Sequence, residues 1–592
     1  MATAPNIGFR GTMLPHEGAG DHEVRHYPEG VPRHLHYPKM PTWGLLDRAC
    51  NFVPQRTAIE FLGRRWSYAQ IRKASWNLAA WLQQHQVGAG SRVGVLLPNC
   101  PEYAIAVHGI WRAGGVVVAL SPLSVAEEVE RLVAHTQCET VICLDMLAPL
   151  LAPVFNDLRH LVWVTLSDHL SPLKAAAYRA IRAQRTGRMW WRCQAKETWL
   201  TSILSGNGQH PHPVEVIPDR SPAFLLGTSG TTGTSRVVTL SHANLVSNAW
   251  QQLFWAGATM GDETLMAVLP FFHSYGMSAI LNTGFALGAT LVVLPRFAPP
   301  QVVRTMHRHQ PTVLHAVPAM LDAMNYVLRK RSGDFSRLKW VVSGGASLPV
   351  EVGAEFADRT GAIVVEGYGL SEASPVTHVG PLDGSSHLGT IGLPLPDTQA
   401  CIVDASTGTQ AVPDGEVGEL IVRGPQVMLG YWDNPQGTGE VLRNGWLYTG
   451  DLAYRSDDGY FHIVDRKKDL IISNGFNVYP SDVEEVLRRH EGVDEVAVIG
   501  IPDKRRGEIV KAFVRLKPRQ AVSVEELERY CREHMAAHLR PRLWEIVEGE
   551  MPRNFLGKVL RRQLRETSPA AAPQSEDVGE LPPELLVEEA ES

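Results

Sequence analysis

The residues best suited to chemistry form a run of glycines and hydroxyl side chains from position 228 to position 233. Glycines let backbone N–H groups approach a ligand closely, and hydroxyl side chains add further hydrogen-bond donors. Arg236 follows the run with a fixed positive charge. Dense neutral donors beside one cation suit a polyphosphate, whereas the alternative is a flexible linker. The run consists of Thr228, Ser229, Gly230, Thr231, Thr232 and Gly233.

Two carboxylates follow glycine-containing turns farther along the chain. Glu372 comes shortly after Gly369 and offers a hard oxygen ligand of the kind that suits Mg²⁺ bridging phosphates. Asp451 follows a Thr-Gly pair, where a carboxylate can accept hydrogen bonds from two hydroxyls of a ribose. The alternative for Asp451 is the cap of a turn, a position that Asp also favours.

A histidine and a lysine complete the set of candidates. His273 lies in the Pro-led aromatic cluster between Leu269 and Met277, which fits a hinge-like loop beside an apolar pocket. A lone histidine in such a place is more often structural than catalytic. Lys558 follows Gly557, so it is a mobile cation on a loop, and taken alone it would be interpreted as surface charge.

Buried strands and amphipathic helices must position these side chains. Apolar runs at 223–226 and 237–240 predict a strand on each side of the glycine-rich loop. Between residues 71 and 120, helical and strand patterns alternate, which implies parallel sheets with right-handed crossovers. The sequence therefore predicts an α/β fold.

Two further predicted strands, beginning at Trp340 and Val364, run into glycine-rich turns. Turns at the carboxyl ends of strands are where α/β sheets build ligand sites. Tyr368 offers a flat face for an adenine ring, with Gly345 and Ala346 closing from the other side. We therefore expect one ligand site to draw on both turns.

The composition is that of an ordinary soluble globular protein, with 44% hydrophobic and 20% charged residues among 592. A chain of this length exceeds what one core supports, so two or more domains are expected. The net charge is −6, but the last 25 residues hold seven acids and no Lys or Arg, which leaves +1 for residues 1–567 and gives no case for nucleic-acid binding. The seven cysteines are scattered along the chain, and the N-terminal residues lack the apolar core of a secretion signal, which favours reduced thiols and a cytoplasmic protein. No apolar stretch reaches the length of about 18 residues that predicts a membrane span.

The glycine-rich loop resembles the phosphate loop of the acyl-adenylate-forming superfamily, which includes acyl-CoA synthetases, luciferases and the adenylation domains of peptide synthetases. That loop typically reads T-S-G-T-T-G-x-P-K-G-V. Residues 228–233 match it throughout, whereas Ser235, Arg236 and Val237 replace Pro, Lys and Gly. The hydroxyl half of the motif is intact and the cationic half is altered.

Two downstream motifs also resemble the superfamily. Tyr368 to Glu372 is similar to its Y-G-x-T-E motif, with Ser371 keeping the hydroxyl of the threonine, and Asp451 closes its ribose-binding T-G-D. The resemblance implies that the protein binds ATP and Mg²⁺, with Glu372 and Thr228 as the metal ligands. Residues implied to hold the nucleotide are residues 228–233, Arg236, Gly345, Ala346, Tyr368, Gly369, Ser371 and Asp451.

The C-terminal motifs resemble those of the family's mobile lid. The resemblance implies a ribose-contacting Arg466, a hinge at Lys467 and Lys468, and a loop at Gly475 that closes on the pantetheine of coenzyme A. It also implies that Lys558 reaches into the site during adenylation. In ligases of fatty and aryl acids, the histidine that corresponds to His273 lies next to the acyl carboxylate.

Residues 1–40 are rich in Gly, Pro and His, which predicts an extended arm, and the Ala-, Pro- and Glu-rich residues 568–592 predict a disordered acidic tail. The superfamily resemblance implies a large α/β domain of parallel-sheet layers (41–466) and a small α+β lid (467–567), with the active site between the two domains. The implied reaction has two halves. A carboxylate attacks the α-phosphate of ATP to give an acyl-adenylate and pyrophosphate, and the thiol of coenzyme A then takes the acyl group.

The absence of Asp and Glu between Met266 and Leu321 favours a free fatty or aryl acid over an amino acid, since amino-acid-activating members carry an Asp in this region. Three stretches most resemble medium- or long-chain fatty-acid ligases, namely Tyr27–Pro32, Asp465–Pro480 and the basic aromatic segment 170–193, and aryl acids such as cinnamates come next. Three alternatives stay open: an adenylate-only ligase that loads a carrier protein, a luciferase-like oxygenase, and a non-catalytic binding protein on the same fold.

The segment 170–193 combines basic and aromatic residues without an acid. Such a stretch suits an anionic membrane surface, and Arg179, Arg182 and Arg185 are the cations on which this hypothesis depends. The alternative is a solvated basic helix that packs its aromatics on the body of the protein. An oligomer is possible, but the sequence does not decide it.

Overall fold

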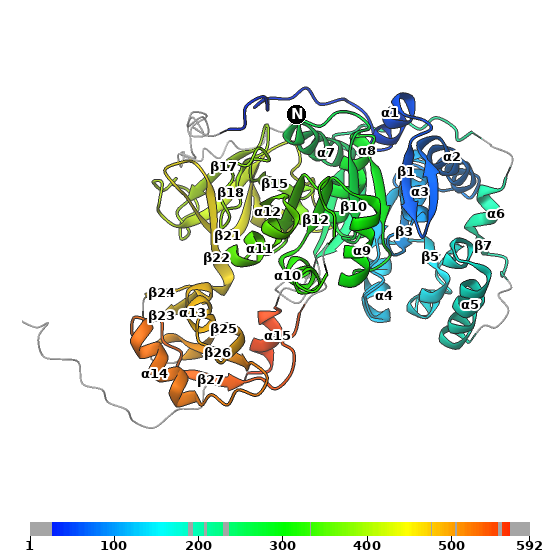
Figure 1. The fold of residues 1–592 in the computed structure, drawn as a ribbon. Helices are drawn as coiled ribbons and strands as arrows, with labels where there is room; N and C mark the ends of the chain where they lie inside the picture. The colour runs from blue at the N-terminus through cyan, green and yellow to red at the C-terminus, as the bar shows by residue number, and fades with distance from the viewer. Residues whose placement is uncertain are drawn as a thin grey trace, which may run out of the picture. The chain divides into compact units, whose positions relative to one another are not determined.

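A computed structural model describes residues 27–187, 193–206, 210–228, 236–331, 333–474, 476–503, 506–553 and 559–568 of the protein. These residues form two compact units, of which the first ends at Val464 and the second begins at Asp465. Figure 1 shows their helices and strands along the chain. Within the described ranges, no helix is both long and apolar enough to cross a membrane.

The largest sheet of the first unit is parallel over its centre. The strands β14 to β1 run parallel to their neighbours, and antiparallel strands complete both edges. In spatial order, the strands are β16 (Leu393–Pro394), β15 (Val376–Val379), β14 (Ile363–Gly369), β13 (Trp340–Gly344), β12 (Val313–Ala316), β10 (Thr264–Ala267), β11 (Thr290–Val293), β1 (Thr57–Phe61) and β2 (Arg64–Ser67).

A second sheet carries the strands on both sides of the glycine-rich loop. In spatial order, its strands are β19 (Gly430–Tyr431), β9 (Arg236–Ser241), β8 (Pro222–Thr228), β4 (Val116–Ala119), β3 (Arg92–Leu96), β5 (Thr140–Leu144), β6 (His160–Val164) and β7 (Glu197–Trp199). The strands from β8 to β7 are parallel, and β9 and β19 add an antiparallel edge. Strands β4 and β5 are buried throughout, as expected of parallel strands covered on both faces.

The third sheet of this unit is antiparallel where its pairing is recorded. Its strands are β17 (Gln399–Val403), β18 (Gly418–Arg423), β21 (Trp446–Arg455) and β20 (Leu442–Arg443), with β22 (Phe461–Arg466) paired to β21. It brings the T-G-D triplet into β21, so Asp451 belongs to a strand rather than to an open loop.

Helices connect and cover these strands (Figure 1). The hydroxyl of Ser67 caps α2 in a reciprocal box with Gln70, and Pro101 starts α3 at a position where its missing N–H costs nothing. The helices are α1 (Gly44–Phe52), α2 (Tyr68–Gln84), α3 (Pro101–Arg112), α4 (Ala126–Thr136), α5 (Pro172–Thr186), α6 (Leu200–Leu204), α7 (His242–Ala256), α8 (Thr283–Ala286), α9 (Pro299–His309), α10 (Pro318–Leu328), α11 (Val350–Thr360) and α12 (Pro435–Val441). The alternation predicted between residues 71 and 120 is confirmed as α2, β3, α3 and β4.

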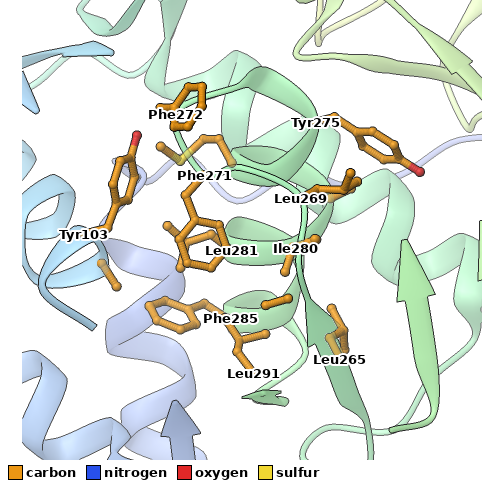
Figure 2. Packing of buried hydrophobic residues seen from close by; sticks show 14 of the residues in the cluster. Tyr103, Leu265, Leu269, Phe271, Phe272, Tyr275, Ile280, Leu281, Phe285 and Leu291 are labelled. Carbon is orange, nitrogen blue, oxygen red and sulfur yellow. The ribbon is translucent and has the colours of Figure 1, made fainter. Parts of the chain in front are cut away.

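The main core of the first unit includes the aromatic cluster around the His273 loop. Figure 2 shows Phe271 and Phe272 of this loop with Tyr103 of α3 and Phe285 of α8, all in one buried group. The segment Gly276–Asn282 that follows the loop is a π-helix (η3). Because π-helical turns are rare and often occur at functional sites, this local irregularity draws attention to the loop.

The second unit is a small mixed α and β structure. Its strands β24 (Phe476–Val478), β23 (Ile471–Ser473), β26 (Gly507–Leu516) and β25 (Val493–Asp503) are antiparallel, and β27 (Leu543–Ile546) runs parallel to β26. Its helices are α13 (Pro480–Arg488), α14 (Val524–His534) and α15 (Arg561–Glu566), with a 3₁₀ turn η5 at Lys467–Asp469. The predicted fold class, a large α/β part with parallel sheets followed by a small α+β part, is confirmed.

Candidate active site

The glycine-rich loop is held at its base by an antiparallel strand pair. Thr228 is the last residue of β8 and Arg236 the first residue of β9, and the two residues pair across the ladder. The Thr228 hydroxyl donates a hydrogen bond to the Arg236 carbonyl oxygen at 3.1 Å. The predicted strand–loop–strand is therefore confirmed at its two strands, and both loop ends start from fixed positions.

The Arg236 side chain contacts Glu440 and Tyr431. Its guanidinium donates to Glu440 Oε2 at 2.7 Å and lies 5.1 Å from the centre of the Tyr431 ring. Tyr431 belongs to the neighbouring strand β19 and pairs with Val238 of β9, which places its ring beside the start of β9. The altered cation of the phosphate-loop motif is thus packed at the edge of the second sheet.

The turns after β13 and β14 lie side by side, as the sequence predicts. These strands are parallel neighbours, with Gly344 opposite Gly367. Gly345 follows with φ of +81°, a left-handed conformation that favours glycine, and Ala346 comes next. A Cβ atom on Gly369 would lie 1.8 Å from the Pro375 carbonyl oxygen, so a side chain has no room there.

The adenine and ribose candidates contact each other directly. The Tyr368 hydroxyl donates to Asp451 Oδ2 at 2.6 Å, although one residue lies in β14, next to its last residue, and the other lies in β21. Asp451 is almost fully buried, and its backbone N–H donates to the Thr449 hydroxyl at 3.1 Å. Gly450 between them has φ of +69°. The Thr-Gly turn thus sets the direction of the Asp451 side chain.

The turn that carries Glu372 is a short 3₁₀ segment, η4 (Ser371–Ala373), and it is tied to three other parts of the unit. The Glu372 backbone carbonyl accepts from Met428 N at 2.8 Å. The Glu372 side chain accepts from the Tyr431 hydroxyl, with 2.8 Å between Oε1 and the phenol oxygen. The Ser371 hydroxyl lies 3.1 Å from that of Ser274, next to His273.

His273 is packed into the aromatic loop and stays neutral. Its Nδ1 accepts a hydrogen bond from the Tyr275 backbone N–H at 3.3 Å, and burial lowers the pKa of its imidazole to about 4. Tyr275 in turn donates to the Val342 carbonyl oxygen of β13 at 3.0 Å. Only a glycine fits at position 276, because a Cβ there would lie 2.1 Å from the Pro270 carbonyl oxygen. A neutral imidazole beside the η4 turn is suited to hydrogen bonding rather than to charge pairing.

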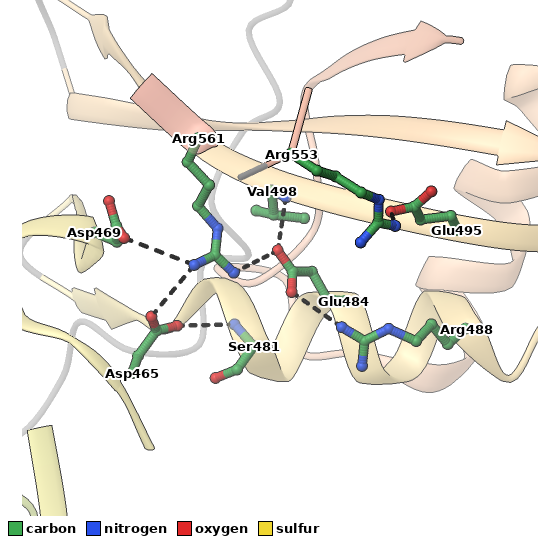
Figure 3. Close-up of polar contacts among 9 residues, drawn as sticks. All are labelled: Asp465, Asp469, Ser481, Glu484, Arg488, Glu495, Val498, Arg553 and Arg561. Atoms are coloured by element: carbon green, nitrogen blue, oxygen red, sulfur yellow. Dashed lines mark hydrogen bonds and ion pairs between the residues drawn. The ribbon is translucent and has the colours of Figure 1, made fainter. Parts of the chain in front are cut away.

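The ribose candidate Arg466 and the hinge candidate Lys468 lie in the chain between two carboxylates of a compact ionic cluster of the second unit. Arg466 ends β22, and Lys468 lies in η5. The carboxylates on both sides of them, Asp465 and Asp469, lie 3.7 and 3.6 Å from the guanidinium of Arg561. Figure 3 shows Arg561 between these two carboxylates and Glu484 of α13, to which it donates at 2.7 Å.

Some predicted site residues lie outside the described residues. They are Ser229, Gly230, Thr231, Thr232 and Gly233 of the phosphate loop, Gly475, and Lys558. The segment that holds Lys558 is flanked by Arg553 and Val559, which form an antiparallel bridge. The roles assigned to these residues stay predictions.

Sequence reasoning missed Tyr431, Glu366 and Arg561. Glu366 of β14 is buried and accepts hydrogen bonds from the backbone N–H groups of Leu348 and Gly389, at 3.0 and 2.8 Å, so it anchors the segment after β13. The sequence did contain a signal for Glu366, because a carboxylate inside a predicted buried strand must find hydrogen-bond partners. The other two act across long sequence separations, which no local pattern displays.

The basic segment requires one correction. Arg182 was expected among the cations that face a membrane, but it is buried and paired with Asp145, with 3.3 Å between Nη1 and Oδ2. Tyr178, one turn earlier, donates to the other Asp145 oxygen. Since a buried charge needs a partner, this pair attaches α5 to the body of the unit. Arg179 and Arg185 stay exposed.

The donor set fits a magnesium ion that arrives with a nucleotide. In the described part of the chain, no group of three or more His, Cys, Asp or Glu side chains could hold a metal ion. Mg²⁺ is commonly bound by one or two protein oxygens together with waters and substrate phosphates. Glu372 offers a carboxylate and Thr228 a hydroxyl, and the η4 turn that carries Glu372 contacts β9, the strand that follows the phosphate loop. These residues fit that mode of binding.

Comparison with known proteins identifies both parts of the chain. Residues 46–432 match the family model described as AMP-binding enzyme, and residues 482–558 match the AMP-binding enzyme C-terminal domain. The long-chain-fatty-acid–CoA ligase of Bacillus subtilis (strain 168) is 37% identical over 543 residues, which cover 91% of this chain and 97% of the relative. The feruloyl-CoA synthase of an Amycolatopsis species is 31% identical over 519 residues, covering 88% and 97%.

The fold also matches solved structures over nearly the whole length. The crystal structure of ATP-bound MatB from Rhodopseudomonas palustris has a TM-score of 0.75 at 28% identity, and covers 89% of this chain and 99% of MatB. The sequence and fold matches thus extend over the same two parts of the chain.

Proposed function

The chain belongs to the family of AMP-binding enzymes, as an AMP-forming acid–thiol ligase, and we propose that it activates a medium- or long-chain fatty acid with ATP and transfers the acyl group to coenzyme A. The identity to a long-chain-fatty-acid–CoA ligase along nearly its full length supports this substrate class. Phe271, Phe272 and Tyr275, which flank His273 in the chain, belong to the main core (Figure 2), and an apolar loop of this kind agrees with an apolar acid.

The observation that carries the proposal is the contact between Tyr368 and Asp451 beside the Glu372 turn. Tyr368 is the last residue but one of β14, and its hydroxyl binds Asp451 at 2.6 Å, while Glu372 follows four residues later in the chain. A ring for the adenine, a carboxylate for the ribose and a carboxylate for the metal–phosphate group therefore come from one region of the first unit. That combination suits a nucleotide held at the carboxyl ends of parallel strands.

The first half-reaction joins the acid to AMP. A carboxylate oxygen of the fatty acid attacks the α-phosphate of ATP, the bond to the β-phosphate oxygen breaks, and pyrophosphate leaves. Such transfers depend on positioning and charge stabilisation more than on covalent participation of the protein. Glu372 and Thr228 would hold Mg²⁺, which neutralises phosphate charge when bound. Arg236 and Lys558 would add positive charge at the outer phosphates and at the reacting centre.

The second half-reaction forms the thioester. The sulfur of coenzyme A attacks the acyl carbonyl of the adenylate, the bond to the phosphate oxygen breaks, and AMP leaves. We assign Arg466 to the ribose, Lys468 to the hinge and the Gly475 segment to the pantetheine arm. A lid that exchanges Lys558 for the Gly475 segment would let one site serve both chemistries.

A peripheral contact with an anionic membrane surface through α5 is part of the proposal. The outward face of α5 carries Leu173, 83% exposed, and Ile181, 48% exposed, with the cations Lys174, Arg179 and Arg185 on its flanks. An apolar face flanked by cations is the arrangement of helices that lie in a lipid headgroup region. This contact would bring a cytoplasmic enzyme to the place where long-chain acids partition.

An aryl acid is the second candidate, because a feruloyl-CoA synthase is 31% identical over 519 residues. A carrier protein in place of coenzyme A would use the same nucleotide residues. The first alternative differs from the proposal in the acid that is activated, and the second differs in the acyl acceptor. One assay that varies the acid and coenzyme A therefore separates them.

The test measures pyrophosphate release by the purified full chain with ATP, Mg²⁺ and a panel of fatty and aryl acids, with and without coenzyme A. Sustained release that requires both a fatty acid and coenzyme A is the expected result. A single burst that ignores coenzyme A indicates an adenylate-only ligase, and preferred turnover of a cinnamate-type acid indicates the aryl alternative. No release with any acid would reject catalysis and favour the binding-protein alternative.

A further inference from the structure

Tyr431 is a buried residue next to the phosphate-loop strands, and its backbone is fixed twice. It pairs with Val238 of β9 across the antiparallel ladder. Its backbone N–H also donates to the Thr438 hydroxyl at the start of α12, at 2.9 Å. The side chain is only 8% exposed, so its ring and hydroxyl have little freedom to move.

The Tyr431 hydroxyl reaches the carboxylate of Glu372. It donates to Oε1 at 2.8 Å from a position 59 residues away in the chain. A tyrosine phenol is protonated at neutral pH, so this hydroxyl is a hydrogen-bond donor. Among the described residues, no hydrogen-bond donor meets the second Glu372 oxygen, Oε2. One carboxylate oxygen is therefore held by the protein and the other is left for a ligand.

The Tyr431 ring also contacts the residue that ends the phosphate loop. The guanidinium of Arg236 lies 5.1 Å from the ring centre, within the range of a cation–π interaction. A single side chain thus contacts both the proposed metal carboxylate and the cation that replaces the family's lysine. No other described residue is recorded in contact with both side chains.

We propose that Tyr431 is a positioning residue for adenylation, whose hydroxyl orients Glu372 toward Mg²⁺ and whose ring holds Arg236 beside the phosphate loop. This inference rests on the proposed role of Glu372 as a magnesium ligand. Hydrogen bonds to a ligating carboxylate fix its orientation, and losing such a partner typically costs about 10–100-fold in metal affinity or activity.

The test is the variant Tyr431→Phe, which removes the hydroxyl and keeps the ring against Arg236. Its affinity for Mn²⁺, measured by electron paramagnetic resonance in the presence of α,β-methylene-ATP, should fall about 10-fold. The Mg²⁺ concentration for half-maximal pyrophosphate exchange should rise by a similar factor. The conversion of supplied acyl-adenylate to thioester, which needs no metal-bound triphosphate, should be unchanged.

Tyr448→Phe is a matched control. The Tyr448 hydroxyl donates to the Gly408 carbonyl oxygen at 2.7 Å, Arg443 lies 4.4 Å from its ring centre, and it is 7% exposed. It therefore loses an equivalent buried hydrogen bond beside an equivalent cation, but it has no contact with Glu372. Its thermal midpoint should fall about as much as that of Tyr431→Phe, with unchanged Mn²⁺ affinity.

Two results would overturn the inference: an Mn²⁺ affinity of Tyr431→Phe within twofold of the wild type, or an equal loss in Tyr448→Phe. A wild-type protein that binds no Mn²⁺ with the analogue would overturn it as well. Intact metal binding without turnover of any fatty acid rejects only the proposed substrate, so the two failures are distinguishable.

Discussion

At the scale of single residues, Arg236 is the clearest departure from the family pattern, and its surroundings explain how it can still serve a phosphate. Its partner Glu440 is 51% exposed, and Arg236 itself keeps 24% of its side chain exposed. Ion pairs this open to solvent contribute about 0–1 kcal/mol. The guanidinium can therefore exchange Glu440 for phosphate oxygens at little cost, and its planar fork can bind two of them at once.

Lys558 is predicted to act in only one half-reaction. In Lys558→Ala, adenylate formation should fall about 100-fold or more, because one positioned charge at the reacting phosphate is lost. Conversion of supplied acyl-adenylate to acyl-CoA should stay close to the wild-type rate. Pyrophosphate exchange and thioester formation measure the two halves separately. Lys517→Ala removes an exposed lysine of the second unit as the control, and equal loss of both halves in Lys558→Ala would contradict the assignment.

At the scale of secondary-structure elements, Arg561 holds three segments of the second unit together. Its guanidinium lies near Asp465 at the end of β22, Asp469 of η5 and Glu484 of α13, as Figure 3 shows. All three carboxylates are at most 9% exposed. Their charges raise the pKa of Arg561 despite its burial, so the guanidinium stays charged. The residues on both sides of Arg466–Lys468 are thereby bound to the helices of the second unit.

Replacing Arg561 by Met should destabilise the second unit by at most about 3–5 kcal/mol, because three buried carboxylates lose the cation that they share. Arg488 still pairs with Glu484 and Arg565 with Asp469, which limits the loss. Hydrogen exchange of the α13 and β25 amides measures this loss directly. The neighbouring Arg562→Met is the control, since Arg562 pairs with Glu566 at an exposed i,i+4 position worth about 0.3–0.5 kcal/mol. Similar exchange rates in the two variants would refute the structural importance of the cluster.

Helix α5 has an inner and an outer side with different tasks. Tyr178 and Arg182 bind Asp145 on the inside, while Arg179 and Arg185 face outward. The Asp145 pair therefore fixes the direction in which the exposed cations point. Arg182 is part of the attachment and not of the proposed membrane contact.

The double variant Arg179→Glu with Arg185→Glu should lose binding to vesicles that contain anionic lipid, since about 1 kcal/mol of attraction is lost with each cation and repulsion is added. Sedimentation with such vesicles gives the readout. Arg304→Glu with Arg308→Glu on α9 makes the same change in net charge at exposed positions elsewhere. Unchanged sedimentation of the α5 variant, or equal loss in the α9 variant, would refute a contact through α5.

At the scale of the whole molecule, the first unit buries several histidines in the neutral form. Burial lowers the pKa to about 3 for His108, His242 and His378 and to about 4 for His315. Each is uncharged in the folded chain at pH 5, whereas the unfolded chain takes up a proton below about pH 6.5. Folding stability therefore falls as pH decreases through this window. Asp145 and Glu366, whose pKa burial raises, act in the opposite direction but are fewer.

The thermal midpoint of the first unit should fall between pH 6.5 and pH 4.5. At pH 5, each such histidine lowers the free energy of unfolding by about 2 kcal/mol, because its pKa in the unfolded chain lies about 1.5 units above that pH. Calorimetry across this range gives the slope, which His378→Gln should reduce and the exposed His387→Gln should not. A midpoint that stays constant down to pH 4.5 would contradict this prediction.

The sequence by itself determined the class of fold, the family and most of the nucleotide-binding candidates. Strand β8, strand β9 and the turns after β13 and β14 follow from runs of a few residues, because burial and backbone conformation are set by near neighbours. Glycines such as Gly345 mark where the backbone must adopt φ values that other residues avoid. Local chemistry was therefore predictable from local spacing.

Only the tertiary structure decided which of these residues contact each other. Tyr368 and Asp451 are 83 positions apart, and Tyr431 and Glu372 are 59 apart. Arg182 turned inward because α5 packs against Asp145, 37 positions earlier. Such contacts depend on the order of strands in the sheets and on the packing of helices over them. A separation along the chain sets no distance in space, so the pairings that orient Glu372 and anchor α5 emerge only when the sheets are assembled.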